Sequence, residues 1–430
     1  MKKIIAITIV FCLMMSLSII AFGNGRDVLS NYVDENFQIE YDKISSLKDD
    51  EEQIKNLIHL YFDMYNHSLK TLKPVEWDIL LIENANTDLI KEIHKYDLEY
   101  NILYNIRFKN YKNIIDFEKI NIEENQAIVN LIYGSDINYD HLQDVNTKIR
   151  NIKYTIKLKK SNLQWKIEAI DSDEYGAKYF KDKMKVKSLF DINESKKIAI
   201  KQALEEVKKA AIEMNKNIQN SYKNLNISEA EKGTLNGTVG IAATVSYNRD
   251  TAIEYARKYA LNNAPFFYSA SSDCTNFVSQ CVWAGYGGWD PTGSDSANRT
   301  RVNNKYRMTS TWYGGTGGGS SSWESVNSFY SYVKSNTGTG PRGTVYEEDK
   351  SVGSFNYSAI AKGDVLQGWP DSQNRYYHSI FISAVLKPGI PAEILYCSHS
   401  TARQDELLTK FTQWVGSGKM RGIRFNSTAY

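Results

Sequence analysis

Apolar residues recur every three or four positions from 51 to 69 and again from 87 to 106, which predicts two amphipathic helices. The pattern then changes to an alternation of apolar and polar residues, which predicts antiparallel strands. The alternating runs are 114–122, 126–133, 148–159 and 164–170. Two helices followed by four strands indicate an α+β domain, which we assign to residues 24–190.

The last predicted strand contains Leu163-Gln164-Trp165-Lys166-Ile167. Together with the order of the elements before it, this strand resembles the cystatin-like cone of nuclear-transport-factor-type domains. The resemblance implies an accessory domain that binds, dimerises or acts as a spacer. The sequence of this half contains no paired acids or metal-ligand cluster that would argue for catalysis.

Another helical pattern begins at Ile192 and continues to about Asn217, with apolar residues on one face and lysines elsewhere. We expect residues 191–240 to form a helix and linker between two domains. Composition changes near residue 233, because only four of the 26 glycines precede that point and six of the eight tryptophans follow it. Residues 241–430 are therefore expected to form a second domain.

The first 23 residues have the composition of a secretory signal peptide. Lys2 and Lys3 precede an apolar run from 4 to 20, and small residues stand near a cleavage point before Asn24. An uncleaved membrane anchor is the alternative, but a run of about 17 residues is at the lower limit for spanning a bilayer. We expect a secreted protein, free or associated with the cell wall, with no stable membrane insertion. The net charge of +2 gives no general attraction to nucleic acid.

The main candidate for a reactive side chain is Cys274. It begins a predicted helix, and the residue before it, Asp273, is a natural N-cap. A thiol at a helix N-terminus lies at the positive end of the helix dipole, which favours the nucleophilic thiolate. Removal of the signal peptide leaves three cysteines, an odd number that guarantees at least one free thiol. The alternative for Cys274 is a small, buried apolar residue, as many core cysteines are.

Two histidines lie next to predicted strands, His378 at the head of one and His399 at the end of the next. A cysteine hydrolase needs a general base, and the base needs a partner that fixes its orientation. His378 and His399 have the chemistry for these roles. The alternative is that both are strand-end histidines bonded to the backbone.

The segment Asp273-Cys274-Thr275-Asn276-Phe277-Val278-Ser279-Gln280, the Gly363-Asp364 turn and the two histidine strands resemble the papain-like NlpC-type peptidases and their CHAP relatives. The upstream Tyr247-Asn248-Arg249 narrows the resemblance to a bacterial family called "putative amidase domain", over about residues 245–425. The resemblance implies a papain-like fold and a secreted cysteine amidase or peptidase. Cys274 would be its nucleophile, His378 its base and His399 the residue that orients His378.

Further site residues are expected around this triad. The backbone N–H of Cys274 would be one oxyanion donor. Plant-type papain-like enzymes have a glutamine as the second donor, but this chain has Tyr268 at that position. The second donor is therefore open, and Tyr247 is a candidate for it. Asp273 is either only an N-cap or a ligand for a substrate amine. Four tryptophans are candidates for lining a substrate groove, namely Trp289, Trp312, Trp323 and Trp369. The alternative is that two or more of them belong to the core.

The expected substrate is a peptide or cell-wall glycopeptide, and the expected chemistry uses no cofactor and no metal. Two alternatives stay open. The first is that the domain is a cell-wall binding module without catalysis. The second is that it is a secreted cysteine protease or toxin that acts on a protein target.

Overall fold

The computed structural model describes residues 35–225, 244–270 and 272–430, which form two compact units. The first unit contains its described residues up to Asn146 and residues Ile152–Ile212. The second contains Thr147–Asn151 and the described residues from Glu213 onward. The predicted signal peptide, residues 1–23, lies outside the described residues. Within the described ranges, every helix is too short or too polar to cross a membrane.

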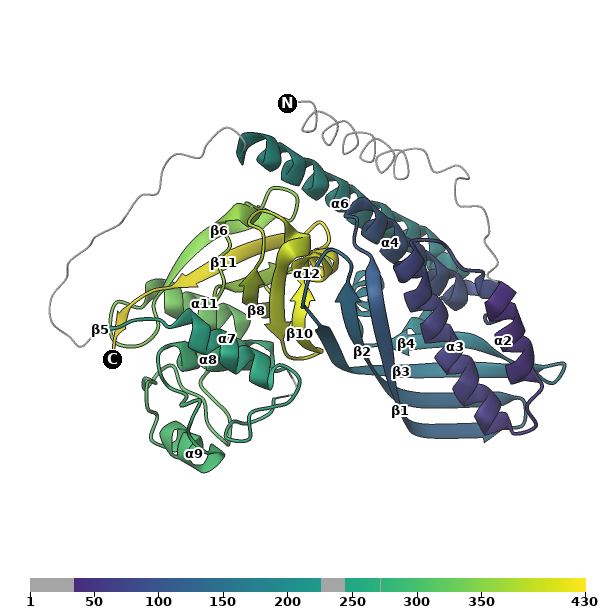
Figure 1. Cartoon of the computed structure of the whole chain (residues 1–430), viewed down its shortest axis with the longest axis horizontal. Helices are drawn as coiled ribbons and strands as arrows, with labels where there is room; N and C mark the ends of the chain where they lie inside the picture. The colour runs from purple at the N-terminus through teal and green to yellow at the C-terminus, as the bar shows by residue number, and fades with distance from the viewer. Residues whose placement is uncertain (1–34, 226–243, 271) are drawn as a thin grey trace. The chain divides into compact units, whose positions relative to one another are not determined.

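The first unit combines helices with an antiparallel sheet (Figure 1). Its helices are α2 (Glu35–Ser45), α3 (Asp50–Thr71), α4 (Ala85–Leu103), α5 (Tyr175–Met184) and the first part of α6 (Lys197–Leu225). Its strands are β1 (Phe108–Glu123), β2 (Gln126–Tyr139), most of β3 (Thr147–Ser161) and β4 (Gln164–Ser172), side by side in that order. The predicted pair of helices and four strands are confirmed, whereas the likeness to a cystatin-like cone stays a prediction.

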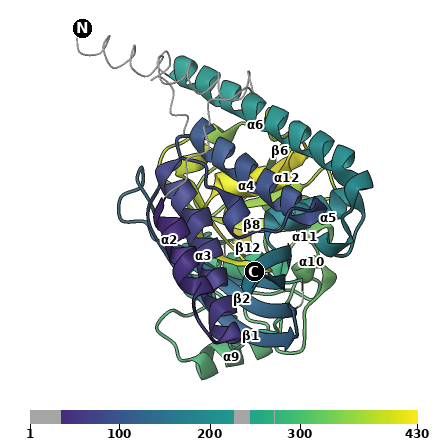
Figure 2. The same cartoon turned by 90° about the vertical axis from the view of Figure 1, so that its right-hand side faces the viewer.

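Helix α3 lies along this sheet, as Figures 1 and 2 both show, and its apolar face is buried there. Strand β2 buries every second residue over its first half, as the alternating sequence predicts. Phe62 of α3 stacks on Tyr133 of β2, with 4.2 Å between the ring centroids. Asp49 caps α3 by accepting a hydrogen bond from the backbone of Glu52 at 2.7 Å.

His94 of α4 is buried in this core. Its Nδ1 accepts a hydrogen bond from the indole of Trp77 at 3.3 Å, so the proton lies on Nε2, which contacts the hydroxyl of Ser68. Ser68 in turn donates to the carbonyl of Tyr65 at 2.9 Å. Burial lowers the pKa of His94 to about 3, which keeps the ring neutral. The contacts satisfy both ring nitrogens, so we assign this histidine to the core and not to catalysis.

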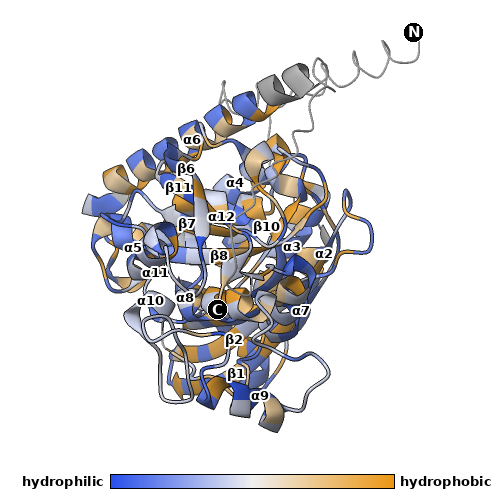
Figure 3. Cartoon of the chain, turned by 90° about the vertical axis from the view of Figure 1, so that its left-hand side faces the viewer, coloured by the Kyte–Doolittle hydropathy of each residue, from blue (hydrophilic) through white to orange (hydrophobic). Residues whose placement is uncertain are grey.

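Helix α6 runs through the boundary between the units and is amphipathic, as its sequence predicts. Figure 3 shows polar and apolar residues alternating along it. Its buried residues recur at helical spacing and are Ile200, Ala203, Leu204, Val207, Ala211, Met214 and Ile218. Ile198, an apolar residue in the first turn of this helix, is exposed.

The second unit is also mixed α+β, with helices packed on an antiparallel sheet. Its helices after α6 are α7 (Arg249–Tyr259), α8 (Cys274–Gly285), α9 (Asp295–Asn303), α10 (Ser321–Glu324), α11 (Val326–Ser335) and α12 (Leu408–Val415). Its main strands are β6 (Gly343–Ser351), β7 (Val365–Trp369), β8 (His378–Val385), β9 (Ile394–Ser398), β10 (Ala402–Leu407) and β11 (Lys419–Phe425). They are ordered β10–β9–β8–β7–β11–β6, and residues 147–151 pair with β10. A short pair, β5 (Thr244–Val245) with β12 (Thr428–Ala429), joins the ends of the domain.

Helix α8 is the central element of this unit, since all twelve of its residues are buried. It packs against α7 and β8, and its apolar side chains share one core with Val365, Phe381 and Cys397 of the sheet. Asn248 caps α7 by accepting a hydrogen bond from the backbone of Thr251 at 3.1 Å. The first turn of α8 is thereby held against the strands that carry the candidate histidines.

Candidate active site

Cys274 is the first residue of α8, as the sequence predicts. Its side chain is 6 % exposed, and its backbone N–H lies in the first turn, where amides have no acceptor within the helix. The N-terminal end of the helix dipole favours negative charge at this position. The thiol therefore lies at the positive end of the dipole of a buried helix.

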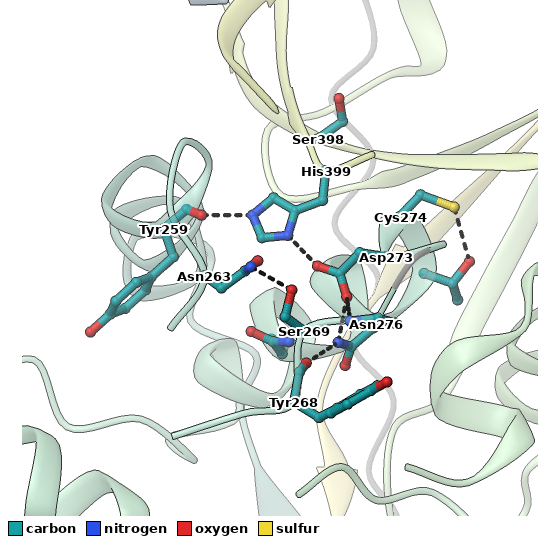
Figure 4. A network of polar contacts seen from close by, with 12 residues as sticks. Tyr259, Asn263, Tyr268, Ser269, Asp273, Cys274, Asn276, Ser398 and His399 are labelled. Carbon is teal, nitrogen blue, oxygen red and sulfur yellow. Dashed lines mark hydrogen bonds and ion pairs between the residues drawn. The ribbon is translucent and has the colours of Figure 1, made fainter. Parts of the chain in front are cut away.

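Asp273 occupies the N-cap position, but its side chain does not cap the helix, which corrects the role predicted for it. One carboxylate oxygen instead accepts from the side-chain amide of Asn276 at 2.7 Å and from the backbone N–H of Ala270 at 3.2 Å. The other contacts Nδ1 of His399 (Figure 4). The residue before Cys274 is thus a buried carboxylate that is held by Asn276, Ala270 and His399.

His399 lies just after β9 with both ring nitrogens engaged. Its Nε2 is 2.7 Å from the carbonyl oxygen of Tyr259, which can only accept, so Nε2 carries a proton. Its Nδ1 is hydrogen-bonded to the carboxylate of Asp273, and both side chains are buried. The ring also stacks on Phe277, with 4.1 Å between centroids.

These contacts correct the role predicted for His399. Because both nitrogens are bound, His399 has no donor or acceptor left to orient His378. It connects Asp273 to the end of α7 at Tyr259, and so fixes the turn that precedes Cys274.

Asn276 holds a second loop against the first turn of α8. Its side-chain nitrogen donates to the carbonyl of Tyr268 at 3.0 Å, and its oxygen accepts from the indole of Trp323 at 2.7 Å. Tyr268 also donates its backbone N–H to Gly315 at 2.9 Å, while its side chain is 48 % exposed. An exposed aromatic ring therefore stands on a loop that is fixed next to Cys274.

Strand β8 meets the first turn of α8 through Ser379, whose hydroxyl lies 3.1 Å from that of Thr275. Thr275 Oγ1 lies 3.7 Å from the sulfur of Cys274. His378 is the neighbour of Ser379 and the first residue of β8, and it is buried. Its ring lies edge-on to Trp414 of α12, with 5.5 Å between centroids. The structure thus brings the residues next to Cys274 and His378 into direct contact.

Tyr247 is not an oxyanion donor, contrary to the prediction. Its ring packs against Gly285, at the C-terminal end of α8, about 16 Å along the helix axis from Cys274. Its hydroxyl donates to the carbonyl of Gly363 at 3.2 Å. A Cβ on residue 285 would clash with this ring, so Gly285 is needed for the packing of Tyr247.

Trp289 and Trp312 were candidates for a substrate groove, but both belong to the core. Trp289 packs edge-on against Tyr255, and Trp312 packs on Trp323 with 4.5 Å between ring centroids. Gly314 and Gly319 serve this packing, because a Cβ on Gly314 would clash with the Trp323 ring and one on Gly319 would crowd the same ring. Trp369, the fourth candidate, is partly exposed and donates to the carbonyl of Gln373 at 2.7 Å.

The other two cysteines in the described ranges are free thiols that lack the environment of Cys274. Burial raises the pKa of Cys397 to about 12 and that of Cys281 well above its ordinary value. Both are fully buried in the core shared by α8 and the sheet. Among the described residues, no group of three or more His, Cys, Asp or Glu side chains is arranged to hold a metal ion.

Comparison with known protein families gives one match. Residues 246–422 match the family described as "Putative amidase domain", which indicates amide hydrolysis as the activity of this part of the chain. The match confirms the family resemblance read from the Cys274 motif and the histidine strands. No curated protein and no solved structure matches the chain.

Proposed function

We propose that residues 246–422, the part of the chain that matches the amidase family, hydrolyse amide bonds through the thiol of Cys274. One observation carries the proposal, namely that Cys274 is the first residue of a buried helix next to the strand that begins with His378. A thiol in this position is stabilised as the thiolate, which is the nucleophilic form. The papain-like fold implied by the sequence motif is part of the proposal.

His378 is the proposed general base. It begins β8, and the next residue of that strand is hydrogen-bonded to the residue that follows Cys274. Imidazole is the side chain best suited to accept and return a proton near neutral pH. The support for His378 is this position together with the family match.

The proposed reaction has two halves. The thiolate of Cys274 attacks the amide carbonyl carbon, and the C–N bond then breaks as protonated His378 gives its proton to the leaving amine, which forms a thioester. Water then attacks the thioester and gives a proton to His378, and the C–S bond breaks to release the carboxylic acid and to restore the Cys274 thiolate and protonated His378. The backbone N–H of Cys274 is the proposed donor to the oxyanion in both halves.

The proposed substrate is a peptide of the bacterial cell wall, and the proposed location is outside the cell. The signal-peptide pattern of residues 1–23 supports export, and the resemblance of the Cys274 motif to secreted bacterial amidases supports the substrate class. Tyr268 offers an exposed aromatic surface on the loop next to the thiol, where a peptide or glycan could be held. The first unit is proposed to be a cystatin-like accessory domain.

The test is the release of new amines from purified peptidoglycan by the full chain, compared with Cys274→Ala. Cys281→Ala is the matched control, because it removes a thiol from the same helix. We expect release by the wild type and the control, and none by Cys274→Ala. Equal release by wild type and Cys274→Ala would exclude a cysteine amidase, and binding without release would identify the domain as a cell-wall binding module. Cleavage of labelled proteins but not of peptidoglycan would identify a protein-directed protease.

A further inference from the structure

A row of buried polar side chains crosses the sheet of the second unit and ends at Cys274. It begins at Arg421 of β11, continues through Gln367 of β7 and Ser379 of β8, and reaches Thr275 of α8. All four side chains are buried, and the strands that carry them are direct neighbours. The row is therefore a continuous hydrogen-bond network that excludes water.

The direction of the hydrogen bonds is fixed at Arg421. A guanidinium can only donate, and Arg421 Nε lies 2.8 Å from Oε1 of Gln367. This contact places the amide oxygen of Gln367 toward Arg421, so that its NH₂ group faces the other way. The NH₂ group donates to the carbonyl of Val326 at 3.0 Å and to the hydroxyl of Ser379 at 3.1 Å.

The same direction continues to the thiol. Because Ser379 accepts from Gln367, its own hydroxyl hydrogen is available for Thr275 at 3.1 Å. Thr275 Oγ1 lies 3.7 Å from the sulfur of Cys274. A thiolate can only accept, so with Cys274 ionised the Thr275 hydrogen goes to the sulfur and the Ser379 hydrogen goes to Thr275. Each bond in such a chain polarises the next one.

The far end of the row carries a fixed positive charge. The guanidinium of Arg421 lies over the rings of Tyr330 and Tyr376, at 3.4 Å and 3.7 Å from their centroids. The hydrogen bonds that link Arg421, Gln367 and Ser379 are therefore donated in the direction that leads from the cation toward Thr275. This arrangement favours negative charge on Cys274.

We infer that Thr275 donates a hydrogen bond to the thiolate of Cys274, and that Ser379, Gln367 and Arg421 hold it in that role. The inference rests on the proposed function, because it explains how the nucleophile of that site is kept ionised. It adds Thr275 as a residue that contacts the reacting atom and Ser379 as a positioning residue.

The test is the pH dependence of alkylation of Cys274 by iodoacetamide in the full chain, followed by peptide mass spectrometry. We expect Thr275→Val, which keeps the shape and removes the hydroxyl, to raise the midpoint by roughly one pH unit. Thr275→Ser keeps the hydroxyl and is expected to leave the midpoint unchanged. Neighbouring charged and titratable groups, which include Asp273, His378 and His399, are the same in both variants.

Ser379→Ala provides a second, independent variant in case Thr275→Val does not fold. We expect it to raise the midpoint by a smaller amount, because Thr275 is then no longer held as a donor. An unchanged midpoint in the folded variants would overturn the inference. Alkylation needs no substrate, so an unchanged midpoint in a protein that still releases amines would leave the proposed function intact. A shifted midpoint without amine release would refute the proposed function alone.

Discussion

The carboxylate of Asp273 is hydrogen-bonded to Nδ1 of His399, which follows it by 126 residues. The contact joins the residue before the candidate nucleophile to the end of β9, and Nε2 of the same ring extends the connection to Tyr259 at the end of α7. Three segments distant in sequence therefore meet at one imidazole. We regard this pair as the structural support for the position of Cys274.

The Asp273–His399 pair should be strongly coupled. Both side chains are buried and hydrogen-bonded to each other, so removing one leaves a polar atom of the other without its partner, which typically costs about 1–3 kcal/mol. We expect His399→Gln and Asp273→Asn each to lower the free energy of unfolding by about that much, as measured by urea denaturation. The double variant should be much less destabilised than the sum, and strict additivity would show that the two side chains do not interact.

The three described cysteines should differ sharply in reactivity. Burial raises the pKa of Cys281 and Cys397, the latter to about 12, so both remain protonated thiols at pH 7. Only the thiolate reacts with iodoacetamide, and at pH 7 the thiolate fractions of Cys281 and Cys397 are very small. We therefore expect Cys274 to be labelled at least about tenfold faster than the other two. Peptide mapping after short exposures measures the three rates. Comparable labelling of Cys397 in the folded protein would contradict the assignment.

Tyr247→Phe should leave catalysis unchanged. The change removes the hydrogen bond to the carbonyl of Gly363, which should cost about 1 kcal/mol of stability. The ring packs at the far end of α8 from Cys274, so kcat/KM on a cell-wall peptide should stay at the wild-type value. A tenfold loss of kcat/KM with unchanged stability would restore Tyr247 as a candidate oxyanion donor.

His94 should make the first unit sensitive to acid. Its pKa is about 3 in the folded protein against 6.5 in the unfolded chain, so below pH 6.5 the unfolded state binds more protons. The contribution of His94 to the free energy of unfolding is therefore fully present above about pH 6.5. It is lost as the pH falls toward 3, by up to about 1.4 kcal/mol per pH unit. His94→Phe should flatten this slope between pH 6 and 4 in urea titrations followed by tryptophan fluorescence. The exposed His59→Gln is the control, and equal slopes in wild type and His94→Phe would refute the assignment.

Local patterns in the sequence were sufficient for most of the regular elements. The helical spacing before residue 106 and the alternation after it predicted α3, α4 and strands β1 to β4, because each of these elements buries one face. The start of α8 at Cys274 was also predicted, since helix starts depend on a few neighbouring residues.

The contacts of the site could not be predicted in the same way, because they join distant segments. Asp273 has the chemistry of an N-cap, and only the position of His399 in the fold explains why it bonds elsewhere. The glycine-rich segment with Trp312 and Trp323 has the composition of a surface loop, yet both indoles are buried. Thr275 and Ser379 were not singled out, although their hydroxyls next to Cys274 and His378 are the signal that could have suggested them.

The most direct test of the account is the detection of an acyl-enzyme on Cys274. The full chain is mixed with solubilised cell-wall peptides, quenched in acid and analysed by intact mass and peptide mapping. We predict a mass increase on the peptide that contains Cys274, removed by neutral hydroxylamine as a thioester should be, and absent in Cys274→Ala. Release of amines without such an adduct, and at the same rate in Cys274→Ala, would contradict the account.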